Sequence, residues 1–311
     1  MTTTGTPAIG AGAPVLAIDV GGTRLKSVVV GAGGEIGPVR RVPTPRSTTD
    51  PGGVVVAAIA ALVATTRRQV EIEAVGVTIP GHVDERAGIG VSSANLGWRN
   101  YPFATALRRA TGLPVALGHD VRAAGEAEYR IGAAVGFSDI AVMIIGTGIG
   151  VALRLDGRSY TGRGLAGELG HSIVDPSGPV CRCGNRGCLE AIASAGALAR
   201  RFSDAGGVAA DAAAVLRLAA AGDPLAGRIW DEALSALATG LAQLSAVVAP
   251  EAILLGGGLA EAGDQLFGPL PGLLRAARGT APTPLILPAA LGQDAGALGA
   301  ALAARDLLER P

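Results

Sequence analysis

A chain of 311 residues, 49% of them hydrophobic, suggests one large domain or two smaller ones and is long enough for a sizeable core. Its 26 basic residues balance its 26 acidic residues, so nothing favours nucleic acid or an anionic membrane surface, since both require a basic excess. Three cysteines cannot all be paired within one chain, which argues against a secreted disulfide scaffold and favours the cytoplasm.

The first residues look like neither a signal peptide nor a membrane anchor. Residues 1–13 lack the basic patch and the continuous apolar run of a secretory signal, and we expect a flexible tail there. Nowhere do 18 apolar residues run without a charge or a turn signal, so we expect no membrane span.

From Val15, the stretch VLAIDVGGTRLKSVVVGAGGEIGPV alternates β-branched runs with glycine turns. This pattern predicts three strands in an antiparallel meander. The elements expected next in the chain are a helix at 54–68, a strand at 74–79, a helix at 104–111, a short strand at 114–118 and a helix at 121–134.

From Asp139, DIAVMIIGTGIGVALRLDGRSY repeats the strand, glycine turn and strand pattern about 125 residues after the first copy, a spacing that suits one domain each. The repeat indicates either two related lobes or a chance likeness, because apolar and glycine strings are common. The elements expected after it are helices at 191–202, 208–221, 225–248, 260–277 and 295–308, with strands at 252–258 and 284–288. Strands that alternate with helices predict α/β lobes, each with a largely parallel sheet, and a cleft between the lobes.

All three cysteines lie in GELGHSIVDPSGPVCRCGNRGCLEA, which runs from Gly167 to Ala191. Three thiolates and one imidazole complete a tetrahedral zinc shell, and a shell of four protein ligands is typical of a structural site. A redox centre would favour a Cys-x-x-Cys spacing, which is absent, while three unrelated buried cysteines are the other alternative. The predicted zinc ligands are His171, Cys181, Cys183 and Cys188.

Two glycine turns follow apolar strands, at Asp19–Thr23 and Gly146–Gly150. Glycines there let backbone N–H groups approach phosphate oxygens, and Thr23 or Thr147 can add a hydroxyl donor. Neither is a Walker A loop, because the Gly-Lys-Ser/Thr ending is missing, and each alone could be a plain hairpin turn. The carboxylate of Asp19 could hold Mg²⁺ through water.

Carboxylates at three other positions have two interpretations. Asp120 stands where a strand gives way to a helix, so it is either an N-cap or a general base for a hydroxyl. Glu168 and Glu190 flank the cysteine cluster and either bind a polyol or are solvated surface groups.

Together these motifs resemble the ROK family of bacterial sugar kinases, in the actin-like ATPase superfamily. The strongest likeness is in the segment GELGHSIVDPSGPVCRCGNRGCLE. The two phosphate loops of the family resemble IDVGGTRLKSVVV and IGTGIG, and its adenosine segment resembles LLGGG. A stretch on the sugar side resembles VTIPGHVDERAGIGVSSANLGW. The resemblance implies two actin-like (ribonuclease H-like) lobes with a structural zinc knuckle at 168–190. The first lobe would comprise 14–120 and 295–311, and the second 121–294.

The resemblance also implies ATP-dependent phosphorylation of a hexose, usually at O6, with Mg²⁺, and a homodimer. Asp120 matches the catalytic base. The residues that match sugar-binding positions are Gly81, Asn95, His119, Asp120, Glu168, His171 and Glu190. The residues that match nucleotide-binding positions are Asp19, Gly21, Gly22, Thr23, Lys26, Gly146, Thr147, Gly148, Gly256, Gly257 and Gly258. His171 would serve both zinc and sugar, one ring nitrogen for each.

One departure affects the sugar. His119 replaces an asparagine that contacts sugar hydroxyls in the family, so an N-acetylated hexosamine or an amino sugar such as kanosamine is an alternative to glucose. A sugar-sensing protein without catalysis is a further alternative. A repressor would need an N-terminal DNA-binding segment for which the residues before Val15 leave no room. Polyphosphate could replace ATP, although such family members generally lack the zinc knuckle.

Overall fold

A computed structural model describes residues 9–309, which form two compact units. Unit 1 comprises the described residues up to Gly132, the short segment Gly162–Leu165 and the residues from Asp294 onward. Unit 2 comprises Ala133–Thr161 and Ala166–Gln293. Each unit contains its own sheet and its own hydrophobic core.

The sheet of unit 1 is mixed. Its strands, in the order β3-β2-β1-β4-β8, are β3 (Arg40–Pro43), β2 (Arg24–Val30), β1 (Val15–Val20), β4 (Ala74–Ile79) and β8 (Val115–His119). The first three are antiparallel to their neighbours, while β1, β4 and β8 run parallel. The expected meander is therefore present, but its third strand lies at 40–43, and the sheet is half antiparallel instead of largely parallel.

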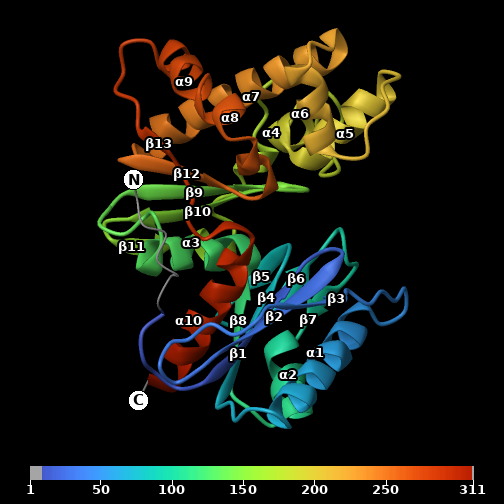
Figure 1. The fold of residues 1–311 in the computed structure, drawn as a ribbon, viewed down its shortest axis with the longest axis vertical. Helices are drawn as coiled ribbons and strands as arrows, with labels where there is room; N and C mark the ends of the chain where they lie inside the picture. Colours follow the sequence, from blue (N-terminus) through green and yellow to red (C-terminus); the bar gives the residue numbers. More distant parts are fainter. Residues whose placement is uncertain (1–8, 310–311) are drawn as a thin grey trace. The chain divides into compact units, whose positions relative to one another are not determined.

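Helices cover both faces of this sheet (Figure 1). Leu16 and Ile18 share a core with α1 (Pro51–Arg67) and α2 (Phe103–Thr111). Val15 and Ala17 alternate with them and so point to the other face, where α10 (Ala295–Glu309) packs beside α3 (Asp120–Ile131). The contact surface of α10 is rich in alanine and glycine, which lets the backbones approach closely.

A small antiparallel sheet of three short strands belongs to unit 1 as well. It consists of β5 (His82–Asp84), β6 (Ile89–Ser92) and β7 (Arg99–Tyr101). The indole of Trp98 packs edge-on against the ring of Phe103, with 4.8 Å between centroids, and anchors this sheet on the core. The sequence did not predict these strands, because three or four residues are too few to establish an alternating pattern.

The sheet of unit 2 repeats the arrangement of unit 1. Its strands, in the order β11-β10-β9-β12-β13, are β11 (Arg158–Tyr160), β10 (Ile149–Leu155), β9 (Ile140–Ile145), β12 (Ala252–Gly256) and β13 (Leu285–Pro288). Again the first three are antiparallel and the last three parallel. The two sheets therefore share strand order and direction, which favours related lobes over a chance likeness of sequence.

Unit 2 has six helices among the described residues, and α4, α5, α6 and α9 pack against the long α7. The six are α4 (Leu189–Ala193), α5 (Ala195–Asp204), α6 (Ala212–Ala220), α7 (Pro224–Val248), α8 (Asp264–Phe267) and α9 (Leu270–Arg278). Short 3₁₀ segments occur at Leu169–His171 and Gly258–Ala262 in unit 2, at Gly162–Gly164 in unit 1, and at Gly292–Asp294, where the chain passes from unit 2 to unit 1. One core cluster joins α7 to the apolar faces of β9, β10 and β12.

Two expected helices are broken. The helix expected at 191–202 is two helices, because Ser194 has an extended backbone and its hydroxyl caps α5 by accepting from the N–H of Ala197. The prediction of one helix at 260–277 is wrong, because this stretch contains α8 and α9 as separate helices. Gly263 has a φ of +56°, and Pro269 has no N–H to donate to a continuing helix.

The expected flexible tail falls partly on residues 1–8, which lie outside the described residues. Beyond them, the guanidinium of Arg305 donates to the carbonyl oxygens of Gly10 and Ala13, which ties this segment to α10. The lobe boundary expected after residue 120 also differs from the compact units, because α3 packs on α10 within unit 1.

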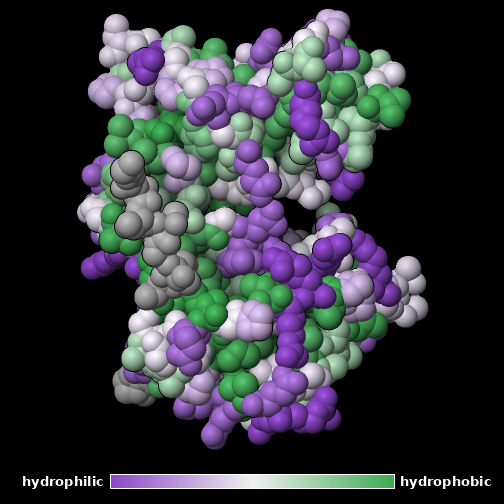
Figure 2. Space-filling view, viewed as in Figure 1, coloured by the Kyte–Doolittle hydropathy of each residue, from purple (hydrophilic) through white to green (hydrophobic). Residues whose placement is uncertain are grey.

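No helix within residues 9–309 has the length and apolar character needed to cross a membrane. On the face seen in Figure 2, hydrophilic and hydrophobic residues are interspersed.

Candidate functional site

Two of the predicted site residues lie at one edge of the unit 1 sheet, where the parallel strands end. Asp19, near the end of β1, is in register with Thr78 of β4. Thr78 is in register with Gly118 of β8, and Asp120 follows this strand directly. In α/β sheets, ligands bind beyond the carboxyl ends of the parallel strands, so this edge is the natural place for a site.

Asp19 is a largely buried carboxylate. The hydroxyl of Thr78 donates to its Oδ1 at 3.0 Å, and the ammonium of Lys26 lies 3.8 Å from its Oδ2. Burial raises the pKa of Asp19, while Lys26 and the Thr78 hydrogen bond oppose that shift. A buried carboxylate with a raised pKa gains from a nearby cation, which fits the predicted role toward Mg²⁺.

The first glycine turn lies against Asn95. A side chain at Gly22 would overlap the amide of Asn95, so the two residues are in direct contact and a larger residue at 22 would displace the Asn95 side chain. The guanidinium of Arg46 donates to the carbonyl oxygens of both Gly22 (2.7 Å) and Asn95 (2.9 Å). The hydroxyl of Thr44 donates to the carbonyl of Gly21. The predicted phosphate turn and the predicted sugar residue Asn95 are thus neighbours, and Thr23 at the tip is exposed.

Gly81 occupies the turn between β4 and β5. Its φ is +97°, and a Cβ there would overlap the carbonyl of Ser92. Both observations require glycine, so its place in the motif has a structural cause.

Asp120 is the first residue of α3, and the N-cap of that helix is His119. Nδ1 of His119 accepts from the backbone N–H of Arg122 at 3.4 Å. Nε2 of His119 lies 3.4 Å from Oδ1 of Asp120, and that oxygen accepts from the N–H of Val121. The Asp120 side chain keeps 33% of its surface exposed. The N-cap interpretation of Asp120 is therefore wrong, because its neighbour performs that task.

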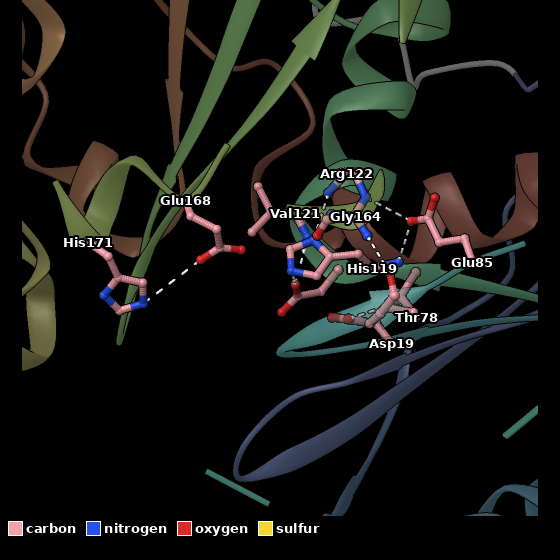
Figure 3. A network of polar contacts seen from close by, with 11 residues as sticks. Asp19, Thr78, Glu85, His119, Val121, Arg122, Gly164, Glu168 and His171 are labelled. Atoms are coloured by element: carbon pink, nitrogen blue, oxygen red, sulfur yellow. Dashed lines mark hydrogen bonds and ion pairs between the residues drawn. The ribbon is translucent and has the colours of Figure 1, made fainter. Parts of the chain in front are cut away.

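Sequence reasoning missed a clamp on this segment. Oε1 of Glu85 accepts from the backbone N–H of His119 at 2.9 Å and from Nε of Arg122 at 3.0 Å. The Arg122 guanidinium also donates to the carbonyl oxygens of Val83 and Gly164 (Figure 3). Arg122 follows the predicted base closely enough to have been suspected, whereas Glu85 lies 34 residues before His119 and gave no signal.

In unit 2, the second glycine turn is held by a predicted sugar residue. Oε2 of Glu190 accepts from the N–H of Ile149 at 3.0 Å, and a side chain at Gly148 would overlap that oxygen. The carbonyl of Gly146 accepts from the N–H of Ala195. Glu190 therefore helps to shape the turn that contains Gly146, Thr147 and Gly148.

The third glycine run follows β12. Gly257 has a φ of +81°, and a Cβ there would meet the backbone of Ile145 on the neighbouring strand. The positions next to it differ: Gly256 faces Ile144 and Ala289, and Gly258 faces open space. The three glycines therefore form a turn at the carboxyl end of β12 whose backbone is not shielded by side chains of its own.

The four predicted metal ligands converge in unit 2. The ligand atoms of His171, Cys181, Cys183 and Cys188 all lie within 4.8 Å of one another. Sγ of Cys181 is 3.8 Å from Nδ1 of His171, and Sγ of Cys183 is 3.6 Å from that of Cys188. A tetrahedral zinc site with bonds of about 2.3 Å has edges of about 3.8 Å. The donor set and its spacing therefore fit a tetrahedral zinc ion.

Local backbone geometry creates this cluster. The N–H of Cys181 donates to the carbonyl of Asn185, and the N–H of Gly184 donates to the carbonyl of Cys181, closing a tight turn between the ligands. Burial raises the pKa of the Cys188 thiol to about 12, whereas the N–H of Asn185 lowers the pKa of Cys183. Metals bind the thiolate, so a bound cation would have to displace the proton of Cys188.

His171 offers a different nitrogen to each neighbour. Nδ1 faces Cys181, and Nε2 lies 3.9 Å from Oε2 of Glu168 (Figure 3). A ring oriented by a metal at one nitrogen can donate from the other, which matches the dual role implied by the resemblance.

A cavity of about 810 Å³ in unit 2 contains none of the predicted site residues. It lies along α7 and is bordered by an ion cluster of Arg201, Arg228 and Glu232. We do not assign this cavity as the functional site, because the predicted catalytic, substrate-binding and metal-binding residues lie elsewhere in the chain.

Comparison with known proteins places these features in a family. A glucokinase of Thermotoga maritima is 35% identical over 273 residues, covering 82% of this chain and 85% of the relative. An N-acetylmannosamine kinase of Citrobacter koseri is 36% identical over 302 residues, covering 93% and 98%.

The fold gives the same result. A ROK family glucokinase from Streptomyces griseus, solved in complex with glucose and AMPPNP, matches with a TM-score of 0.82 and 32% identity over 94% of this chain and 99% of that chain. The model of the ROK family matches residues 15–307. This chain belongs to the ROK family.

Proposed function

We propose that the protein is an ATP-dependent sugar kinase that phosphorylates the 6-OH of a glucose-type hexose, with Asp120 as general base. The observation that carries the proposal is the shared edge of β1, β4 and β8, where Asp19 and the first residue of α3 follow neighbouring strands. Membership of the ROK family supports the same assignment.

In this mechanism Asp120 accepts the proton of the sugar hydroxyl. The hydroxyl oxygen forms a bond to the γ-phosphorus as the bond from that phosphorus to the bridging oxygen of ADP breaks. Backbone N–H groups of the glycine turns bind phosphate oxygens and stabilise the charge that develops on them. Asp19 would hold, through water, the Mg²⁺ that accompanies ATP, and that ion would neutralise phosphate charge.

The sugar contacts we propose are Gly81, Asn95, Glu168, His171 and Glu190. The relatives are named for two kinds of substrate, glucose and N-acetylmannosamine, so a hexosamine kinase is the alternative within the same reaction class. Kanosamine and N-acetylglucosamine are further candidates.

We also propose that the cluster of His171, Cys181, Cys183 and Cys188 binds one structural zinc ion. The supporting observation is the donor set, whose atoms all lie within 4.8 Å of one another. Four protein ligands leave no open position for a reacting water, so the ion would act as a scaffold.

ADP release coupled to a sugar panel tests the proposal. The panel contains glucose, mannose, N-acetylglucosamine, N-acetylmannosamine, glucosamine and kanosamine, with ATP or polyphosphate as donor. We expect one strong responder with ATP. If every sugar is silent with folded, zinc-loaded protein, the kinase assignment is wrong, and calorimetric binding of a sugar would then indicate a sensor.

A further inference from the structure

The ring of His119 has a defined tautomer because it caps α3. Its Nδ1 accepts the backbone N–H of Arg122, so Nδ1 carries no proton. A neutral imidazole then holds its single proton on Nε2. That nitrogen lies 3.4 Å from Oδ1 of Asp120.

The ring is also uncharged. Burial, followed by the nearby Arg122 and His82, lowers the pKa of His119 to about 3. Four charged or titratable side chains surround the ring: Asp120 and Arg122 on α3, Glu85 after β5 and His82 on β5. Near neutral pH the imidazole meets Asp120 as a neutral donor, not as a cation.

The backbone that bears the ring is clamped. Oε1 of Glu85 accepts from the N–H of His119 and from Nε of Arg122, whose side chain is only 9% exposed. Further bonds from Arg122 to the carbonyls of Val83 and Gly164 fix the guanidinium (Figure 3). The start of α3 cannot move without breaking these contacts, and the ring itself is held by the bond from the N–H of Arg122 to Nδ1.

From this arrangement we infer that His119 is a positioning residue for Asp120 and makes no contact with the sugar. Its Nε2–H donates to Oδ1 of Asp120, and with the N–H of Val121 on the same oxygen it fixes the plane of the carboxylate. Both ring nitrogens are then engaged within the chain, so none remains for a sugar hydroxyl. The inference rests on the proposed role of Asp120 as base.

Replacement by serine separates positioning from capping. In His119→Ser the hydroxyl still caps α3, but no N–H reaches Asp120. We expect kcat to fall about 10- to 100-fold, the loss expected for one hydrogen bond to a charged group, with little change in the KM for sugar. The acidic limb of the pH profile should move to higher pH, because a carboxylate that loses a donor binds its proton more tightly.

His119→Asn serves as the matched rescue, because its amide keeps both an acceptor for the cap and an N–H donor. We expect it to recover part of the kcat lost in His119→Ser and to return the acidic limb toward the wild-type position. An unchanged kcat in His119→Ser would leave capping as the only role and overturn the inference. A raised KM for one sugar with an unmoved acidic limb would overturn it in favour of sugar contact.

A spectroscopic test does not depend on turnover. The chain has three histidines, so ¹⁵N NMR of the histidine-labelled full-length protein is simple to assign by the loss of one set of signals in His119→Asn. We expect His119 to show an unprotonated Nδ1 and a protonated Nε2. A ring protonated at Nδ1 would overturn the inference even if the enzyme is active. Silence of the sugar panel with the expected tautomer would instead count against the proposed function.

Discussion

At the scale of single residues, the carboxylate of Asp120 is the group on which turnover should depend. Asp120→Asn keeps the shape of the side chain but removes its capacity to take a proton. We expect kcat to fall by about 10²- to 10⁴-fold, the range for loss of a general base. Calorimetry should still detect sugar binding, since the other proposed sugar contacts remain.

The exposed Asp231 on α7 provides a matched control, and Asp231→Asn should keep wild-type activity. Wild-type turnover in Asp120→Asn would rule out the assignment of the base.

A second expectation at this scale concerns acid stability. The folded chain holds His119 with a pKa of about 3, against an ordinary value of 6.5 in the unfolded chain. Below pH 6.5 the unfolded chain therefore binds more protons, and the free energy of unfolding falls as the pH drops toward 3. The slope from this one group is about 1.4 kcal/mol per pH unit.

Urea unfolding of wild type and His119→Ser at about pH 7 and pH 5 tests this contribution, because the imidazole is the one titratable group that the two proteins do not share. The wild type should lose more stability between the two conditions. Equal losses would mean that the imidazole becomes charged in the folded chain as readily as in the unfolded one.

At the scale of elements, the close approach of α10 to its neighbours depends on glycine. A Cβ at Gly299 would overlap the carbonyl of Ala123 on α3, and one at Gly76 would overlap the carbonyl of Ala300. We expect Gly299→Ala to destabilise unit 1 by about 1–3 kcal/mol through overpacking. Urea unfolding followed by Trp98 fluorescence measures this.

Gly227→Ala in α7 is the control, since a Cβ there meets nothing within 4 Å. It should be neutral or stabilise the protein by about 0.4–1 kcal/mol. Equal effects at the two positions would contradict the packing argument.

Elements with a strong local pattern could be predicted from the sequence, and those set by distant contacts could not. The apolar runs of β1 and β9 with their glycine turns gave the start of both sheets, and the long apolar pattern of α7 was evident. The four metal-ligand candidates could also be predicted, because they lie close together along the chain.

Local sequence patterns could not predict which residues surround the predicted base, Asp120. The clamp joins Glu85 to His119 and Arg122 across 34 and 37 residues, and nothing in the HVDER stretch distinguishes that glutamate from a surface residue. Similarly, Glu190 was expected at the sugar, but its contact with the second glycine turn spans 41 residues. Such pairings are determined only when the sheets assemble.

At the scale of the whole molecule, the two units should respond differently to loss of metal. The cluster of His171 and the three cysteines lies entirely in unit 2. We expect Cys183→Ser to lower zinc content from about one ion per chain and to destabilise unit 2, because metal binding to such sites is coupled to folding. Arg182→Lys, at the exposed position beside it, should leave zinc and stability unchanged.

The two tryptophans allow each unit to be followed separately. Trp98 belongs to the core of unit 1 and Trp230 to that of unit 2. In a Trp98→Phe background, the fluorescence of Trp230 should report a lower midpoint for Cys183→Ser, while the Trp98 signal in a Trp230→Phe background should move less. A fully stable, active and metal-free Cys183→Ser would refute the structural zinc site.

The position of α10 after unit 2 in the chain has a consequence for synthesis. Unit 1 begins with β1 but needs Ala295–Glu309 to cover the face of its sheet formed by Val15 and Ala17. During translation, every strand and helix of unit 2 therefore leaves the ribosome before that face can be covered. Unit 1 therefore cannot complete its core before unit 2 has been synthesised, which differs from the usual case of an N-terminal domain that folds before the next one emerges.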